Sequence, residues 1–198
     1  MLAQLNFEET PRLEGFPEKG LLQFWIGDDE YFGADLDSPE NQADFRVRFF
    51  PEIEKDTSRL RADFPDWASF DMPLPTDSSF SIDFEATEEL MSVADFRFEN
   101  EFGADFFEQF DKRSDAVWEE FEEISSAPGH KIGGYPHFSQ EDPRFEEAHP
   151  PTVLLFQLDS DDEMDLMWGD AGVANFFIRE ADLARLDFSH VHFNWDCY

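Results

Sequence analysis

Apolar residues occur along the chain in short runs or in alternation with polar residues, and both patterns are typical of β-strands. The nearly continuous run from Val153 to Leu158 predicts a buried strand, whereas the alternation from Asp44 to Phe49 predicts a strand with one exposed face. The segments with one pattern or the other are residues 2–6, 20–26, 44–49, 80–84, 153–158, 173–178 and 190–195. Acidic or Pro-containing loops separate these segments, so we expect several short strands.

Helical spacing is clearest over residues 104–125, where apolar side chains recur on one face. The members of this face are Phe106, Phe110, Val117, Trp118, Phe121 and Ile124. A shorter helix is predicted for residues 87–95, with Thr87 as a cap, and a helix or turn for 180–186. Residues 56–79 contain three prolines and predict an irregular connection.

Two parts of the chain resemble each other. Leu2 to Asn6 is similar to Leu155 to Asp159, and Gly20 to Ile26 is similar to Gly172 to Ile178. Gln4 precedes Gly20 by 16 positions and Gln157 precedes Gly172 by 15, so order and spacing agree. We therefore expect one domain, residues 1–198, built from an internal duplication. Its repeat-like segments are 1–50 and 131–198, and its middle segment is 51–130.

The C-terminal copy has an upstream element, Gly133-Gly134-Tyr135-Pro136-His137-Phe138. The matching element of the N-terminal copy would lie before Met1. We therefore expect that the N-terminal copy is shortened and that a strand edge is exposed there.

The charge of the chain narrows the classes of function. There are 47 Asp and Glu against 14 Lys and Arg, which gives a net charge of −33. Such a charge repels phosphate backbones and anionic lipid, so we expect neither nucleic-acid nor membrane binding. No apolar run approaches the ~18–20 residues of a membrane-spanning helix, and Cys197 alone forms no intrachain disulfide. These features favour a cytoplasmic protein.

The acidity itself has three interpretations. A surface poor in Lys and rich in carboxylates suits a salt-adapted protein, because salt screens its self-repulsion. An acidic surface also suits docking on a basic protein partner. Imitation of DNA is the least favoured, because the acidic residues are spread through every segment.

One acidic loop is a candidate for metal binding. Alternating carboxylates at Asp159, Asp161 and Glu163, with Asp170 twelfth in the run, loosely follow the spacing of a calcium loop. The candidate ligands in this loop are Asp159, Asp161, Asp162 and Asp170. Met164 replaces the turn glycine of an EF-hand and the flanks predict strands, so an EF-hand is excluded while a simpler Ca²⁺ site stays open. The alternative is a solvated loop. His190 and His192 would share one strand face, but the sequence identifies no third zinc ligand for them.

The chain resembles the YwqG-like family of bacterial proteins of unknown function. The resemblance rests on Lys131-Ile-Gly-Gly-Tyr-Pro-His-Phe-Ser-Gln-Glu-Asp-Pro-Arg144, on Leu154 to Asp162, on Met167 to Ile178 and on Phe193 to Cys197. Members usually carry an additional N-terminal segment, which we expect this chain to lack. The resemblance implies an α+β fold with antiparallel sheets and an internal duplication. It supplies no activity, cofactor or catalytic residue.

Two classes of function remain. The charge, together with the lack of G-x-S-x-G and phosphate-loop motifs, favours a non-catalytic interaction protein that neutralises a basic partner. The alternative is a Ca²⁺-dependent ligand-binding protein or a hydrolytic enzyme, in which the 159–170 loop lines a cleft together with Gln157, Trp168 and Asn175. Convergent carboxylates in a pocket would favour the alternative. The two related sheet units are expected to share a core rich in the 25 Phe residues.

Overall fold

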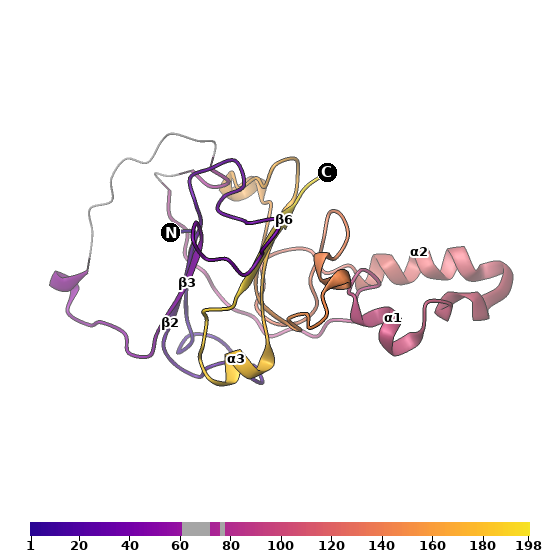
Figure 1. The fold of residues 1–198 in the computed structure, drawn as a ribbon, viewed down its shortest axis with the longest axis horizontal. Helices are drawn as coiled ribbons and strands as arrows, with labels where there is room; N and C mark the ends of the chain where they lie inside the picture. The colour runs from indigo at the N-terminus through magenta and orange to yellow at the C-terminus, as the bar shows by residue number, and fades with distance from the viewer. Residues whose placement is uncertain (61–71, 76–77) are drawn as a thin grey trace.

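The computed structural model describes residues 1–60, 72–75 and 78–198, and these form an α+β fold with two three-stranded antiparallel sheets (Figure 1). The N-terminal sheet contains β1 (Ala3–Asn6), β2 (Leu21–Trp25) and β3 (Arg46–Phe50), in that order. The C-terminal sheet contains β4 (Val153–Asp159), β5 (Val173–Ile178) and β6 (His192–Asp196), also in order. The predicted fold class is therefore confirmed.

The strand register supports the internal duplication. Gln4 lies opposite Gln23 in the N-terminal sheet, and Gln157 lies opposite Asn175 in the C-terminal sheet. Three residues after each first glutamine, the same bond recurs: Phe7 N–H donates to the Gly20 carbonyl (3.0 Å), and Ser160 N–H donates to the Gly172 carbonyl (3.1 Å). The two sheets thus repeat one pairing pattern as well as one sequence pattern.

One Phe-rich core joins the two sheets. Phe24 and Phe176 occupy equivalent positions of β2 and β5, and their ring centroids lie 4.8 Å apart. Phe176 also stacks on Phe193 of β6 at 4.4 Å, and Phe24 contacts Phe156 of β4 at 4.7 Å. Because aromatic rings from both sheets pack against each other here, the sheets bury their inner faces together.

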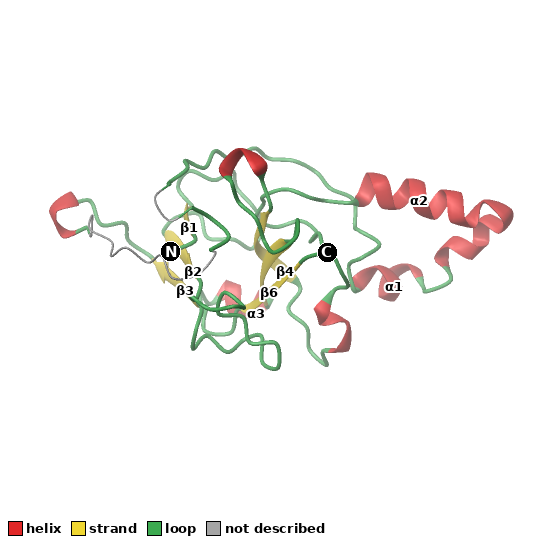
Figure 2. Ribbon diagram, turned by 90° about the horizontal axis from the view of Figure 1, so that it is seen from above, coloured by secondary structure: helices red, strands yellow, loops and turns green. Residues whose placement is uncertain are grey.

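A helical arm, residues 97–125, extends away from the sheets in two perpendicular views (Figures 1 and 2). It contains α1 (Arg97–Phe102), the 3₁₀ segment η2 (Phe106–Arg113) and α2 (Ser114–Ser125). The single helix predicted over 104–125 is divided, since Asp111 has φ 50° and ψ −124°, outside helical geometry. Its predicted apolar face is also partly exposed, at Trp118 (40%) and Ile124 (61%).

Two sequence predictions are wrong. Residues 80–84 form no strand, because no other described strand pairs with them, although Phe84 still packs against the core. Residues 87–95 form no helix. There the Ser92 hydroxyl accepts a hydrogen bond from Ala94 N–H and the Asp95 carboxylate accepts one from Arg97 N–H, and such local bonds compete with helical ones.

The remaining elements are short. They are η1 (Thr57–Arg59), η3 (Pro143–Glu146), η4 (Asp162–Met164) and α3 (Glu180–Ala184), of which α3 confirms the prediction for 180–186. Part of the irregular connection predicted over 56–79 lies outside the described residues, at 61–71 and 76–77. Among the residues described, no helix has the length and apolar character needed to span a membrane.

Candidate functional site

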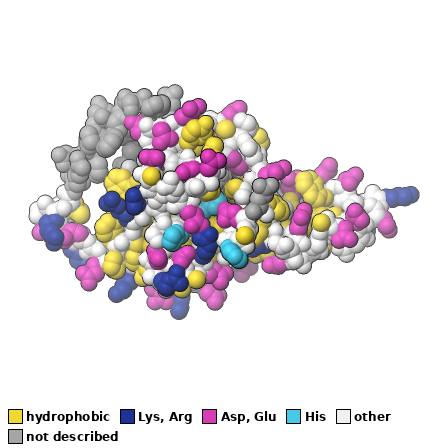
Figure 3. Space-filling view, in the orientation of Figure 1, with side chains coloured by type: hydrophobic (Ala, Val, Ile, Leu, Met, Phe, Trp, Pro, Cys, Tyr) yellow, Lys and Arg dark blue, Asp and Glu magenta, His cyan; other side chains and the backbone are white. Residues whose placement is uncertain are grey.

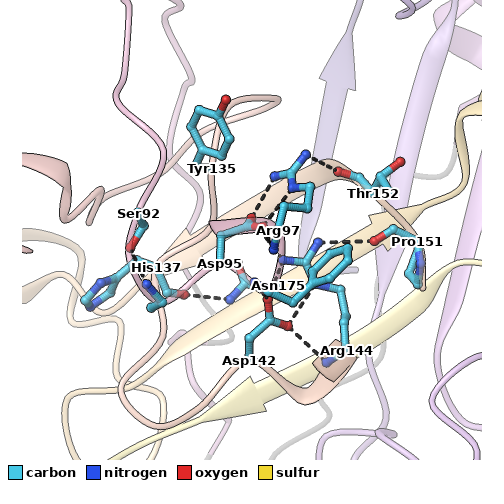
Figure 4. Close-up of polar contacts among 12 residues, drawn as sticks. Ser92, Asp95, Arg97, Tyr135, His137, Asp142, Arg144, Pro151, Thr152 and Asn175 are labelled. Carbon is cyan, nitrogen blue, oxygen red and sulfur yellow. Dashed lines mark hydrogen bonds and ion pairs between the residues drawn. The ribbon is translucent and has the colours of Figure 1, made fainter. Parts of the chain in front are cut away.

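A buried network of ion pairs lies where the helical arm meets the C-terminal sheet (Figure 4). Arg144 has no exposed surface, and its guanidinium binds Asp142 through two hydrogen bonds of 2.8 and 2.7 Å. The same group donates to Asp95 Oδ2 at 3.2 Å and to the Pro151 carbonyl at 3.1 Å. Phe177 of β5 lies against the guanidinium, with its ring centroid 4.1 Å away. A charge held so far from water needs partners of this kind.

A second arginine completes the network. Arg97, at the first position of α1, donates to both oxygens of Asp95 at 2.7 Å and to the Thr152 carbonyl at 3.2 Å. Burial alone raises the pKa of Asp95, but the hydrogen bond from Arg97 and the charge of Arg144 outweigh it, so this pKa lies below its usual value. Asp95 therefore stays ionised.

The opposite charges of the network balance one another, and the network holds separate segments of the chain together. Two carboxylates face two guanidinium groups, and the oxygens of Asp95 and Asp142 are all engaged. The pKa of Asp95 is lowered, which is opposite to the shift expected of a general acid. The network instead connects three segments: the start of α1, η3 and the residues before β4. It thereby anchors the helical arm to the C-terminal sheet.

The sequence alone does not indicate this network. Its only sequence signal is Asp142 followed by Pro143 and Arg144, which is typical of a capped helical turn, and the Asp142 side chain does accept from Arg144 N–H. Nothing in the spacing indicates that Asp95, 47 positions before Asp142, completes the site.

The predicted ligand-binding residues Gln157 and Asn175 lie side by side on the outer face of the C-terminal sheet, and both are fully buried. The Gln157 side chain donates to the Ala127 and Gly129 carbonyls at 3.1 and 2.7 Å, and accepts from His137 N–H at 2.8 Å. Asn175 donates to the His137 carbonyl at 2.8 Å. The two amides hold residues 127–138, here called the covering segment, over the sheet. A role for them in ligand binding stays a prediction.

Trp168, the third predicted ligand-binding residue, lies in the hydrophobic core and not beside the Gln157 and Asn175 amides. It has no exposed surface, and its ring lies 5.4 Å from Phe32 and 6.2 Å from Trp195. Among described residues, neither its indole N–H nor the Asn175 Oδ1 has a hydrogen-bond partner.

The acidic loop does not gather its carboxylates. Asp159 accepts hydrogen bonds from the N–H groups of Gly129 (2.7 Å) and Ser160 (2.9 Å). Asp161 accepts from Glu163 N–H and lies 3.1 Å from His130 Nε2, and this contact lowers its pKa. Asp162 begins η4, and Asp170 is exposed. Over residues 1–60, 72–75 and 78–198, no group of three His, Cys, Asp or Glu side chains is arranged to hold a metal ion.

The calcium site at Asp159, Asp161, Asp162 and Asp170 therefore stays a prediction, which a melting experiment tests. If these residues bind Ca²⁺ in solution, millimolar Ca²⁺ raises the melting temperature by several degrees at matched ionic strength. Asp170→Ala then removes the rise, while Asp37→Ala, another exposed aspartate far along the chain, preserves it. Equal melting temperatures with and without Ca²⁺ would contradict the prediction.

The helical arm exposes apolar side chains beside acidic ones. Phe102, Trp118 and Ile124 are 46%, 40% and 61% exposed. Residues 97–125 include ten acidic and three basic residues, and Arg97 is already neutralised in the buried network. A hollow of about 200 Å³ lies between α1, η2 and α2, lined in part by Phe98, Phe107 and Trp118. In Figure 3, acidic side chains are scattered over the arm with a few apolar ones among them, and basic side chains lie at its tip.

Comparison with known families places the chain in one of unknown function. A family model, "Domain of unknown function (DUF1963)", matches residues 1–197, so the chain belongs to this family. A comparison with curated proteins gave no match.

Proposed function

We propose that this protein is a non-catalytic interaction protein whose helical arm binds a basic, amphipathic segment of a partner protein. We also propose that it is a YwqG-like member of its family, on the motifs that carry that resemblance.

The observation that carries the proposal is the surface of the helical arm. Exposed Trp118 and Ile124 lie on α2 among acidic residues that include Glu119, Glu120 and Glu123. Exposed apolar residues bordered by charge are typical of protein-binding surfaces. Aromatic anchors provide affinity, and the acidic border selects a basic partner and speeds its encounter.

The attachment of the arm supports the same proposal. The buried pairs of Arg97 and Arg144 with Asp95 hold the start of α1 against the C-terminal sheet. Phe98 of α1 in turn contacts Phe107 and Phe121, at 5.8 and 5.7 Å, so the parts of the arm pack on one another. An arm ordered before binding loses less conformational entropy when a partner docks.

Calorimetry with a synthetic amphipathic helix of Leu and Lys tests the proposal, with an oligolysine of equal charge for comparison. We expect the amphipathic peptide to bind more tightly, because only it covers Trp118 and Ile124. Trp118→Ser combined with Ile124→Ser should weaken its binding by about tenfold, or about 1.4 kcal/mol. Leu36→Ser, at an exposed residue outside the arm, is the matched control.

Two results would contradict the proposal. One is equal affinity for oligolysine and the amphipathic peptide, which would mean that charge alone drives binding. The other is unchanged affinity of the Trp118 and Ile124 variant when its circular dichroism is native.

A further inference from the structure

The outer face of the N-terminal sheet is the counterpart of the face that the covering segment occupies in the C-terminal sheet. Gln4, Gln23 and Arg48 lie in register across its strands, as Gln157, Asn175 and Asn194 do across the other sheet. Gln157 and Asn175 are fully buried beneath residues 127–138, whereas Gln4 and Arg48 are exposed. The duplicated surface is thus covered in one copy and open in the other.

The edge strands differ in the same way. In the C-terminal sheet, Lys131 pairs with Gln157 through both backbone bonds, of 3.1 and 2.8 Å. In the N-terminal sheet, Phe7 forms a backbone hydrogen bond with Gly20, the residue directly opposite. Along an antiparallel strand, residues alternately direct their N–H and carbonyl groups toward and away from the neighbouring strand, so those of Gln4, three positions earlier, point away from β2. No described residue outside β2 forms a backbone bond with Gln4. An edge of this kind accepts an added strand.

The side chains on the open face indicate which charges the side chains of an added strand would have. Arg46 stands where the other sheet has His192, whose Nδ1 lies 2.8 Å from Glu147, shortly after the covering segment. Arg46 and Arg48 are both exposed, and neither forms an ion pair with any described residue. In a chain of net charge −33, these two arginines, on one face of β3 and without ion pairs to described residues, are a local site for carboxylates.

The Trp25 side chain provides an apolar contact surface on this face. It occupies the position of Phe177, on which the Arg144 guanidinium and the Phe138 ring lie at 4.1 and 6.2 Å. Trp25 is half-buried, and its indole N–H donates to Gln23 Oε1 at 3.2 Å. Its ring therefore remains available to a side chain of an incoming segment.

We propose that the outer face of the N-terminal sheet binds an extended, acidic segment of a partner polypeptide. The segment pairs with the backbone of Gln4 as Lys131 pairs with Gln157, lies over Gln23 and Trp25, and places carboxylates on Arg46 and Arg48. This surface is separate from the helical arm, so the inference does not rest on the function proposed for the arm.

A titration with a peptide that contains the chain's own covering segment tests the inference. The probe is a synthetic peptide of residues 127–149, which ends beyond Glu147, added to the full ¹⁵N-labelled chain. We expect the NMR signals of the Gln4 and Gln23 amides and the Trp25 indole to shift, while those of Gln157 and Asn175 stay in place. Trp118→Ser with Ile124→Ser should leave this binding unchanged, which separates it from binding by the arm.

Charge reversal distinguishes this surface from the rest of the protein. Arg46→Glu with Arg48→Glu should weaken peptide binding at least tenfold at about 50 mM salt, and by less at about 0.5 M, where exposed charges are screened. Arg12→Glu with Arg59→Glu makes the same change of charge at two other exposed arginines and should have little effect. Gln4→Pro removes the N–H donor and should abolish binding. If Gln4→Pro does not fold, the variant with Arg46→Glu and Arg48→Glu still tests the inference.

Three outcomes would overturn the inference. They are equal binding by the arginine pair variant and its control, peptide-induced shifts at Gln157 in place of Gln4, and a dimer of the peptide-free chain with Gln4 at its interface. The last outcome would identify a second copy of the chain as the occupant.

Discussion

Replacing Arg144 with methionine is expected to destabilise the protein by about 3–5 kcal/mol, which is the usual effect of removing one partner from a buried ion pair. The variant leaves the carboxylate of Asp142 without its bidentate partner and deprives Asp95 of a second positive charge. Both carboxylates are almost completely buried, so water does not replace the lost bonds. Urea unfolding at pH 7 measures the change.

A matched variant separates this effect from a general loss of positive charge. Arg12→Met removes an exposed arginine whose ion pair with Glu18 spans 3.1 Å, with both side chains at least 70% exposed. Exposed pairs of this kind contribute little, so a change within about 0.5 kcal/mol is expected. Equal stability of the Arg144 and Arg12 variants would contradict the structural role of the buried network.

The cost of Arg144→Met should also shrink as the pH falls. In the folded protein, the pKa of Asp95 lies below its usual value, so the stability that this carboxylate provides is complete above about pH 4 and is lost as the pH falls through the lowered pKa. Without Arg144 the carboxylate binds a proton at a higher pH. The two proteins should therefore differ less in unfolding free energy near about pH 4 than at neutral pH.

Phe176→Ala is expected to cost about 3–5 kcal/mol, because it opens a cavity at the contact between the two sheets. Phe176 is fully buried, and its ring lies within 4.4 to 4.8 Å of those of Phe193 and Phe24. Loss of the ring removes contacts with both sheets at once. Phe80→Ala, at a residue that is 46% exposed, should change stability by less than about 1 kcal/mol in the same urea experiment.

The same experiment tests whether the duplicated units form one domain. Because the sheets share a core, we expect a single cooperative transition in the wild-type protein and in Phe176→Ala, seen alike by tryptophan fluorescence and circular dichroism. Separate transitions for the two probes would mean that the sheets unfold independently.

Several elements were predictable because their signal is local. Nearly continuous apolar runs identified β4 and β5, and the repeat of Gln and Gly spacing identified the matching segments that form β1 and β2. Residues 80–84 have equally clear alternation but form no strand, since a strand also requires a partner that alternation does not supply. The helix over 104–125 was predicted from apolar spacing, which contains no sign of the break at Asp111.

The candidate sites were less predictable, because each combines residues that are distant along the chain. Gln157 and Asn175 were identified as notable, but their burial beneath residues 127–138 appears only in the folded protein. The ion network brings Asp95 to Arg144, and no local pattern distinguishes Asp95 from the other acidic residues. The apolar face predicted for residues 104–125 is partly exposed, which the spacing of its residues does not reveal.

Whereas the α+β class was implied by the family resemblance, the sequence by itself determined the acidity of the protein, most of its strand segments, the duplication of its strand units and its richness in Phe. These properties follow from composition and from periodicities of two to four residues, together with a repeat that comparison of the chain with itself reveals. Only the tertiary structure decided which arginines are buried, which face of the duplicated sheets stays open and where the arm exposes tryptophan. Those properties depend on the packing of distant segments, which determines whether a charge is neutralised or left in contact with water.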